Sequence, residues 1–164
     1  DNLLADSEWK KRIEFTYIGN LPKDFSFANA RYLQPMQGEA LARELSSHHV
    51  YVTASMNEPA GMHHIEGAMC GLPLLYRRSG ALPEYCDGFG IEFVGTDFVS
   101  ALQRMMEEYE SHADQMASYP HTAERMCGEY IALFDQILVQ RNAILDNRRL
   151  WRNLWLLLRN QIPF

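Results

Sequence analysis

The stretch HHVYVTASMNEPAGMHHIEGAMCGLPLLYRR, residues 48–78, decides the fold of this chain. It begins with a β-branched, nearly all-apolar run, HHVYVTAS, which is typical of a strand buried on both faces of a sheet. Residues 61–71 predict a short helix that Gly71 ends, and residues 72–78 predict another buried strand. A strand, a helix and a second strand in this order predict a βαβ unit with parallel strands and a right-handed crossover.

The rest of the chain continues the alternation of strands and helices. We expect strands at 12–20, 30–36 and 90–95, a helix at 38–47, and helices from Asp97 onward with a break near Pro120. Residues 79–88 are expected to form a turn-rich connection. The pattern predicts an α/β fold, a Rossmann-like parallel sheet with flanking helices, over residues 1–119, and a helical segment over residues 120–164.

The composition argues against several functional classes. With 47% hydrophobic and 22% charged residues, a chain of 164 residues can form a folded domain with a real core. Its net charge of −6 argues against a general nucleic-acid-binding protein. Three cysteines without a CxxC spacing indicate reduced thiols rather than disulfides or a zinc ribbon. With neither a signal peptide nor an apolar run of about 20 residues, the sequence predicts a cytoplasmic protein.

Three strand-to-helix loops mark the place where a ligand is expected. In parallel α/β sheets, ligands bind beyond the carboxyl ends of the strands, and here the loops after Gly19, over 55–61 and over 79–84 lie there. Glu58 precedes a proline, so its backbone is expected to be extended. The turn that follows, Pro59-Ala60-Gly61, is small enough to leave backbone N–H groups uncovered, which suits a phosphate.

Glu66 poses a separate question. A step of about 100° per residue puts it beside Met62 and Met69 on the helix expected at 61–71, on a side that we expect to face the sheet. A buried carboxylate needs a partner, because an unpaired buried charge is very costly. The residues leave two interpretations open: a core salt bridge or N–H cap, and a pair of ligand hydroxyls such as a ribose diol.

The same residues carry a resemblance to a known family. The segment EPAGMHHIE, residues 58–66, resembles the E-x7-E signature of retaining GT-B glycosyltransferases, and GAMCGLPLLYRRSGALPEY, residues 67–85, resembles the segment that follows it. The run HHVYVTAS is similar to the family's ADVFVLPS strand, and the match extends in consistent order over about residues 12–95. The resemblance is to family 4 glycosyltransferases. It implies the C-terminal, donor-binding half of a GT-B fold without its first strand, followed by long C-terminal helices.

The resemblance also implies roles for individual residues. Glu66 would bind the ribose hydroxyls of the donor nucleotide, and Glu58 would contact the donor sugar at the reacting centre. Gly61 and Met62 would give backbone N–H groups to the sugar and diphosphate. The other implied donor-site residues are Met36 at the nucleobase, Ser79 and Gly80 in the loop facing the phosphates, and Ala60, which replaces the family's aromatic residue and leaves a smaller wall to the sugar pocket. His63, from the second histidine pair, is a further candidate for the lining of the donor pocket.

The implied activity is transfer of a sugar from a nucleotide-diphosphate sugar to an acceptor with retention of configuration. In this family the reaction proceeds on one face of the sugar and uses neither a metal nor a cofactor. The family's phosphate-binding Arg and Lys fall upstream of residue 1, so the fragment is expected to be inactive without the N-terminal acceptor domain of the same protein. Alternatives are a nucleotide-sugar 2-epimerase and a non-catalytic nucleotide-binding or assembly domain.

Two other motifs do not support a site. The pairs His48-His49 and His63-His64 fit no zinc-binding spacing, so no metal is expected. The segment DGFGIEFVG, residues 87–95, contains glycines but leads into a strand, which argues against a dinucleotide-binding fingerprint.

The C-terminal end predicts an amphipathic helix. Over residues 148–159, arginines occupy one side and leucines and tryptophans the other. One interpretation is a helix that packs on the acceptor domain. The alternative is a helix that lies on an anionic membrane surface and makes the protein peripheral to the inner membrane face.

Overall fold

The computed structural model describes residues 1–147. The chain consists of two compact units, Asp1–Ser118 and Tyr119–Phe164. The predicted amphipathic helix at 148–159 lies outside the described residues. The first unit contains the strands and the candidate site.

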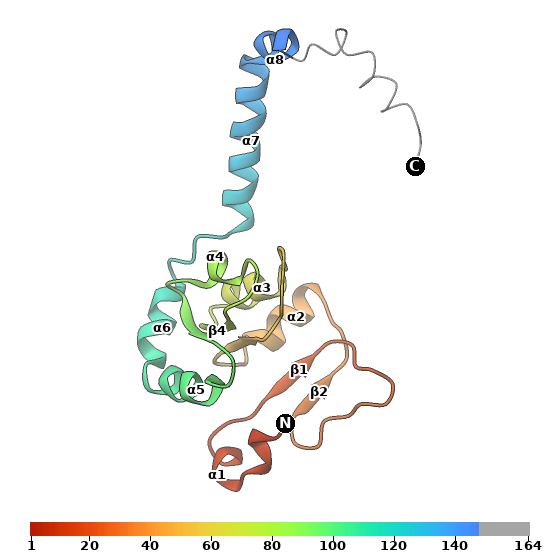
Figure 1. The fold of residues 1–164 in the computed structure, drawn as a ribbon, viewed down its shortest axis with the longest axis vertical. Coiled ribbons are helices and arrows are strands. Elements are labelled where there is room, and N and C mark those ends of the chain that lie inside the picture. Colours follow the sequence, from red (N-terminus) through yellow and green to blue (C-terminus); the bar gives the residue numbers. More distant parts are fainter. Residues whose placement is uncertain (148–164) are drawn as a thin grey trace. The chain divides into compact units, whose positions relative to one another are not determined.

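Five short strands form two parallel sheets in the first unit. They are β1 (Thr16–Ile18), β2 (Arg31–Leu33), β3 (Tyr51–Thr53), β4 (Leu74–Arg77) and β5 (Gly90–Phe93). β1 pairs with β2, which lies beside it in Figure 1, and the second sheet has the order β3-β4-β5. The fold is therefore α/β with parallel sheets flanked by helices, and it is compatible with a Rossmann-like arrangement. The expectation of one sheet is wrong, because β1 and β3 do not pair with each other.

Helices separate these strands as the sequence pattern predicts, with two differences. The helices of this unit are η1 (Leu3–Ala5), α1 (Ser7–Lys10), α2 (Gly38–Leu45), α3 (His63–Met69), α4 (Leu82–Cys86), α5 (Phe98–Glu107) and α6 (Tyr109–Met116). The helix expected to start near Gly61 starts at His63. The turn-rich connection contains α4, because Pro83 is tolerated in the first turn of a helix and the i,i+4 pair Leu82 and Cys86 is fully buried.

The core of the first unit lies between β4, β5 and α5. Leu75 of β4 and Met105 of α5 are fully buried. They belong to one apolar cluster with Ile91, Phe93, Ala101 and Leu102. This packing anchors the strands from which the candidate loops emerge.

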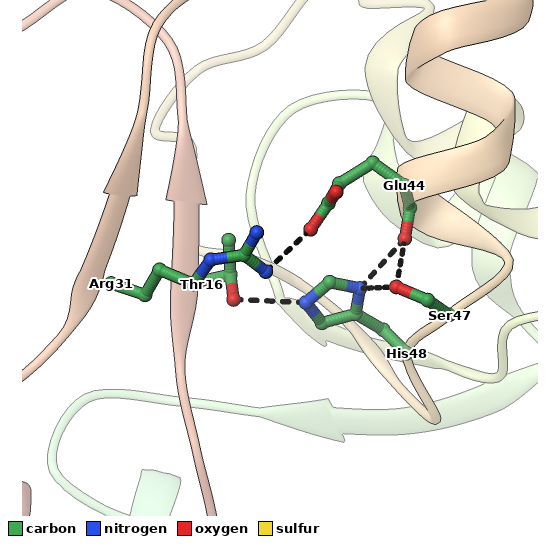
Figure 2. Close-up of polar contacts among 5 residues, drawn as sticks. All are labelled: Thr16, Arg31, Glu44, Ser47 and His48. Carbon is green, nitrogen blue, oxygen red and sulfur yellow. Dashed lines mark hydrogen bonds and ion pairs between the residues drawn. The ribbon is translucent and has the colours of Figure 1, made fainter.

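A polar cluster joins the β1–β2 sheet to the C-terminal end of α2 (Figure 2). His48 Nδ1 lies 2.8 Å from the carbonyl oxygen of Glu44, and His48 Nε2 lies 2.9 Å from Thr16 Oγ1. Arg31 pairs through Nη1 with the Glu44 carboxylate at 2.7 Å. Since the carbonyl can only accept, Nδ1 donates to it. The side chain of His48 thus links the residue that opens β1 to the turn after α2.

The second unit is helical over its described part. It contains α7 (Ala123–Val139) and α8 (Arg141–Asn147), drawn in blue in Figure 1. The predicted break near Pro120 is confirmed, since this residue lies between α6 and α7. Thr122 caps α7, its side chain accepting a hydrogen bond from the Arg125 N–H at 3.2 Å. Within residues 1–147, no helix has the length and apolar character needed to cross a bilayer.

Candidate functional site

The loops that follow β3 and β4 meet at the carboxyl ends of these strands. The N–H of Ala81 donates to the carbonyl of Glu58 at 2.8 Å, and the N–H of Asn57 donates to Ser79 Oγ at 2.7 Å. Gly80 has a φ of +57° and lies directly against the Glu58 backbone, where any Cβ would clash with main-chain atoms. The β4–α4 loop therefore fixes the backbone of Glu58.

The side chain of Glu58 folds over Gly61. A Cβ on Gly61 would lie 2.7 Å from Glu58 Cδ and 2.9 Å from Oε1, so the absence of a side chain there makes room for the carboxylate. The Glu58 side chain is 24% exposed, and its Oε2 lies 3.8 Å from His63 Nε2. The carboxylate is thus half-enclosed and keeps an open side.

His63 opens α3 and contacts residues from two other segments. Its Nδ1 lies 3.2 Å from the hydroxyl of Tyr51 on β3, and its Nε2 lies 3.5 Å from Ser55 Oγ. The rings of Tyr51 and His63 stack with centroids 6.0 Å apart. Gly67, one turn after His63, permits this arrangement, because a Cβ there would overlap the Tyr51 ring.

The hydroxyl of Tyr51 stays protonated over the physiological range. Burial, assisted by the negative charge of Glu66, raises the pKa of Tyr51 from 10.0 to about 12. At neutral pH the phenol can therefore donate its proton in a hydrogen bond.

The combination of a serine, a histidine and a glutamate does not form a hydrolase triad. In such a triad the nucleophile and the carboxylate bind opposite nitrogens of the imidazole. Here Ser55 and Glu58 both approach Nε2 of His63, and Tyr51 occupies Nδ1. The geometry suits hydrogen bonding to a ligand better than activation of Ser55.

The structure corrects the orientation expected for Glu66. The helical phase places it beside Met62 and Met69, but this side of α3 is exposed, with the two methionines 57% and 54% exposed. The buried residues of α3 are His64, Gly67 and Ala68. Because two of these are small, α3 packs closely on β3, while Met69 and the preceding Met62 remain exposed. The interpretation of Glu66 as part of a salt bridge inside the core is therefore wrong, because Glu66 is exposed to solvent.

The other predicted site residues lie at different places. Ala60 is exposed in the turn before α3, and Met62 is the N-cap of α3 without a side-chain hydrogen bond. Met36 is half-buried in the connection from β2 to α2, and thus follows the other sheet. The structure brings together Glu58, Gly61, His63, Ser79 and Gly80, but not Met36.

Two residues of this cluster, Tyr51 and Ser55, were not predicted from the sequence. Ser55 follows β3 directly, a position at the carboxyl end of a strand that could have identified it. The sequence signal for Tyr51 was weaker. His63 and Gly67 are four residues apart and so lie on one face of α3, which is the face that contacts Tyr51.

Arg78 belongs to a different surface. It pairs with Glu92 at 2.6 Å and lines an open cleft of about 640 Å³ along β5. The cleft is also lined by Tyr76, Pro83, Asp87, Gly90, Ile91, Glu92 and Arg104. The guanidinium of Arg78 is therefore paired with a carboxylate of β5.

Within residues 1–147, no group of three or more His, Cys, Asp or Glu side chains could hold a metal ion. The histidine pairs are separated by their contacts. His48 bonds to Thr16, His49 packs edge-on against Tyr109 at 5.6 Å, and His63 bonds to Tyr51.

The sequence matches no protein-family model and no curated protein. The function proposed for this chain therefore rests on the residues of the loops after β3 and β4, on their geometry, and on the sequence resemblance.

Proposed function

We propose that this chain is the donor-binding half of a retaining, metal-independent glycosyltransferase, which transfers a sugar from a nucleotide-diphosphate sugar to an acceptor. The observation that carries the proposal is the position of Glu58. Its backbone is fixed by Gly80 and Ala81, Ser79 holds the neighbouring Asn57, and the Glu58 carboxylate lies over Gly61 at the carboxyl ends of two parallel strands. This is the edge at which α/β sheets bind ligands.

Each glutamate has a role in the proposal. Glu58, half-enclosed, accepts a hydrogen bond from a hydroxyl of the donor sugar. Glu66, exposed on the outer side of α3, accepts from a ribose diol with its carboxylate oxygens. The two glutamates lie in one short segment, residues 58–66, and the proposal assigns the first to the sugar and the second to the ribose of one donor molecule.

The diphosphate is the part of the donor for which we assign the fewest binding groups among the described residues. The resemblance assigns backbone N–H groups of Gly61 and Met62 to it. Arg78, in the neighbouring loop, pairs with Glu92. We therefore assign neutralisation of the diphosphate to Arg and Lys residues other than Arg78, together with the acceptor domain that the same resemblance implies.

The separation of the β1–β2 sheet from the β3-β4-β5 sheet is consistent with a donor domain that has one more strand. β1 and β3 each pair on one side only among the described residues. An isolated two-stranded sheet such as β1–β2 is marginally stable. A further strand between β1 and β3 would join both sheets into one.

The proposed mechanism depends on positioning and charge stabilisation. The nucleoside diphosphate leaves and the acceptor oxygen enters on the same face of the sugar, so the configuration is retained. The rate then depends on holding the sugar in place and on stabilising negative charge on the departing diphosphate. Glu58 holds the sugar in this scheme and is not assigned as a nucleophile.

Calorimetric titration of the intact protein with UDP, GDP and ADP, and then with their sugar conjugates, tests the proposal. We expect one nucleoside diphosphate to bind, Glu66→Ala to weaken it, and Glu58→Ala mainly to lower sugar transfer. Glu39→Ala is the matched control, because this glutamate is 88% exposed on α2 and pairs only with Arg43 one turn away among the described residues. Binding of none of the nucleotides would overturn the proposal.

A further inference from the structure

The imidazole of His63 is held from both sides. Tyr51 lies 3.2 Å from Nδ1, and its ring is fixed against α3 by the space that Gly67 leaves. On the other side, Nε2 faces the Glu58 carboxylate at 3.8 Å and Ser55 Oγ at 3.5 Å. The imidazole is thus oriented, and 35% of its side chain remains exposed.

These neighbours favour one tautomer of His63. A carboxylate only accepts hydrogen bonds, so an unprotonated Nε2 would place two hydrogen-bond acceptors, Nε2 and the Glu58 carboxylate, next to each other. The phenol of Tyr51 is a donor at neutral pH, and Nδ1 without a proton can accept from it. A proton on Nε2, which then points toward Glu58, and an unprotonated Nδ1, which accepts from Tyr51, avoid both acceptor–acceptor and donor–donor contacts.

The distances around Nε2 leave its donor available. An N–H···O hydrogen bond usually measures 2.7–3.2 Å between heavy atoms. The 3.8 Å to Glu58 exceeds this range, and the 3.5 Å to Ser55 lies beyond its upper end. A donor on His63 and an acceptor on Glu58 therefore stand side by side without satisfying each other.

We propose that His63 and Glu58 together bind one hydroxyl group of the ligand, which accepts from His63 Nε2–H and donates to Glu58, and that Tyr51 is the positioning residue that fixes the tautomer. The inference rests on the proposed function, and it makes His63 part of the sugar subsite rather than of the diphosphate site. A hydroxyl is the group that both donates and accepts, so it matches this pair.

Nuclear magnetic resonance tests the tautomer without any ligand. In the intact protein, a long-range ¹H–¹⁵N correlation spectrum at neutral pH should show His63 with its proton on Nε2, the resonance being assigned by its loss in His63→Gln. Tyr51→Phe keeps the ring that packs on Gly67 but removes the hydroxyl, and should give a mixture of tautomers. Tyr130→Phe, at an exposed position of α7, should leave the spectrum unchanged. A neutral ring with its proton on Nδ1 in the parent protein would overturn the inference.

Titrations with UDP, GDP, ADP and their sugar conjugates test the hydroxyl site. The measured quantity is the ratio of the Kd of the free nucleoside diphosphate to the Kd of its sugar conjugate. His63→Ala should lower this ratio about 3- to 10-fold, the range of one hydrogen bond. The Kd of the free diphosphate should stay unchanged. His63→Gln should restore part of the ratio, because its amide N–H can donate from a similar place, and His49→Gln should change neither value.

The outcomes separate the two proposals. An unchanged ratio in His63→Ala, or an equal loss of affinity for the free diphosphate, overturns the hydroxyl site alone. Failure of every nucleotide and nucleotide sugar to bind overturns the proposed function, and the hydroxyl site with it.

Discussion

Gly80 lies against the backbone of Glu58, so closely that no residue with a Cβ fits there. The next residue, Ala81, donates its N–H to the Glu58 carbonyl at 2.8 Å. Loops are commonly the mobile parts of a site, and this contact ties one loop to the other. The orientation of the Glu58 carboxylate is therefore set by main-chain packing as well as by its own side-chain contacts.

We expect Gly80→Ala to destabilise the protein by about 2–3 kcal/mol, because it combines a left-handed φ with a clash against main-chain atoms. Urea denaturation measures the loss. Gly88→Ala is the control, since this glycine also has a positive φ, +80°, but no atom lies within 4 Å of the Cβ position. It should lose only about 1 kcal/mol. Equal losses in the two variants would contradict the contact between Gly80 and Glu58.

Gly61→Ala should change ligand binding more than stability. The three atoms nearest to its new Cβ all belong to the Glu58 side chain, which can rotate away, and no left-handed φ is involved. We expect a stability change below about 1 kcal/mol, together with weaker binding of a nucleotide sugar in calorimetry. Gly128→Ala, in α7 with open space around it, is the control and should be neutral or slightly stabilising. A large drop in stability with full binding would show that Gly61 has another role.

The sequence predicted the elements well because their patterns are local. Each strand lies inside the stretch expected for it, for example β3 within residues 48–55 and β4 within 72–78. The loops after β3 and β4 were predicted to carry the site, and the structure places Glu58 and Gly80 together there. Such a juxtaposition follows from parallel topology, which the alternation of strands and helices specifies.

The failures concern packing, which periodicity alone does not specify. The sequence placed Glu66 on the side of α3 that faces the sheet, because methionines flank it. The buried side is instead formed by Gly67, Ala68 and His64, two of which carry too little apolar surface to dominate a helical wheel. Tyr51 was missed for the same reason, since its place beneath α3 depends on the space left by Gly67.

Thiol reactivity should rank the three cysteines by their burial. Cys86 in α4 is fully buried, and this burial raises its pKa from 9.0 to about 12, so little thiolate forms at pH 8. Cys127 is exposed and Cys70 is partly exposed. We expect a thiol reagent at pH 8 to modify Cys127 first and Cys86 only after unfolding, as followed by peptide mass spectrometry. Rapid modification of Cys86 in the folded protein would contradict the packing of α4.

The raised pKa of Tyr51 predicts a loss of stability at alkaline pH. The phenol ionises near pH 10.0 in the unfolded chain and near pH 12 in the folded protein. Between these values the unfolded chain binds fewer protons than the folded protein. The contribution of the Tyr51 phenol to stability is therefore complete below pH 10 and falls as the pH rises toward 12. The total loss is about 2–3 kcal/mol, from 1.36 kcal/mol per pKa unit.

Denaturation of the parent protein and of Tyr51→Phe at a series of pH values from 8 to 12 measures this contribution. The variant lacks the ionising group, so its stability should fall less steeply above pH 10 than that of the parent protein. Tyr130→Phe serves as the control, because the hydroxyl that it removes is on an exposed residue of α7. Parallel curves for the parent protein and Tyr51→Phe would show that the Tyr51 phenol is not held in the buried position from which it donates to His63.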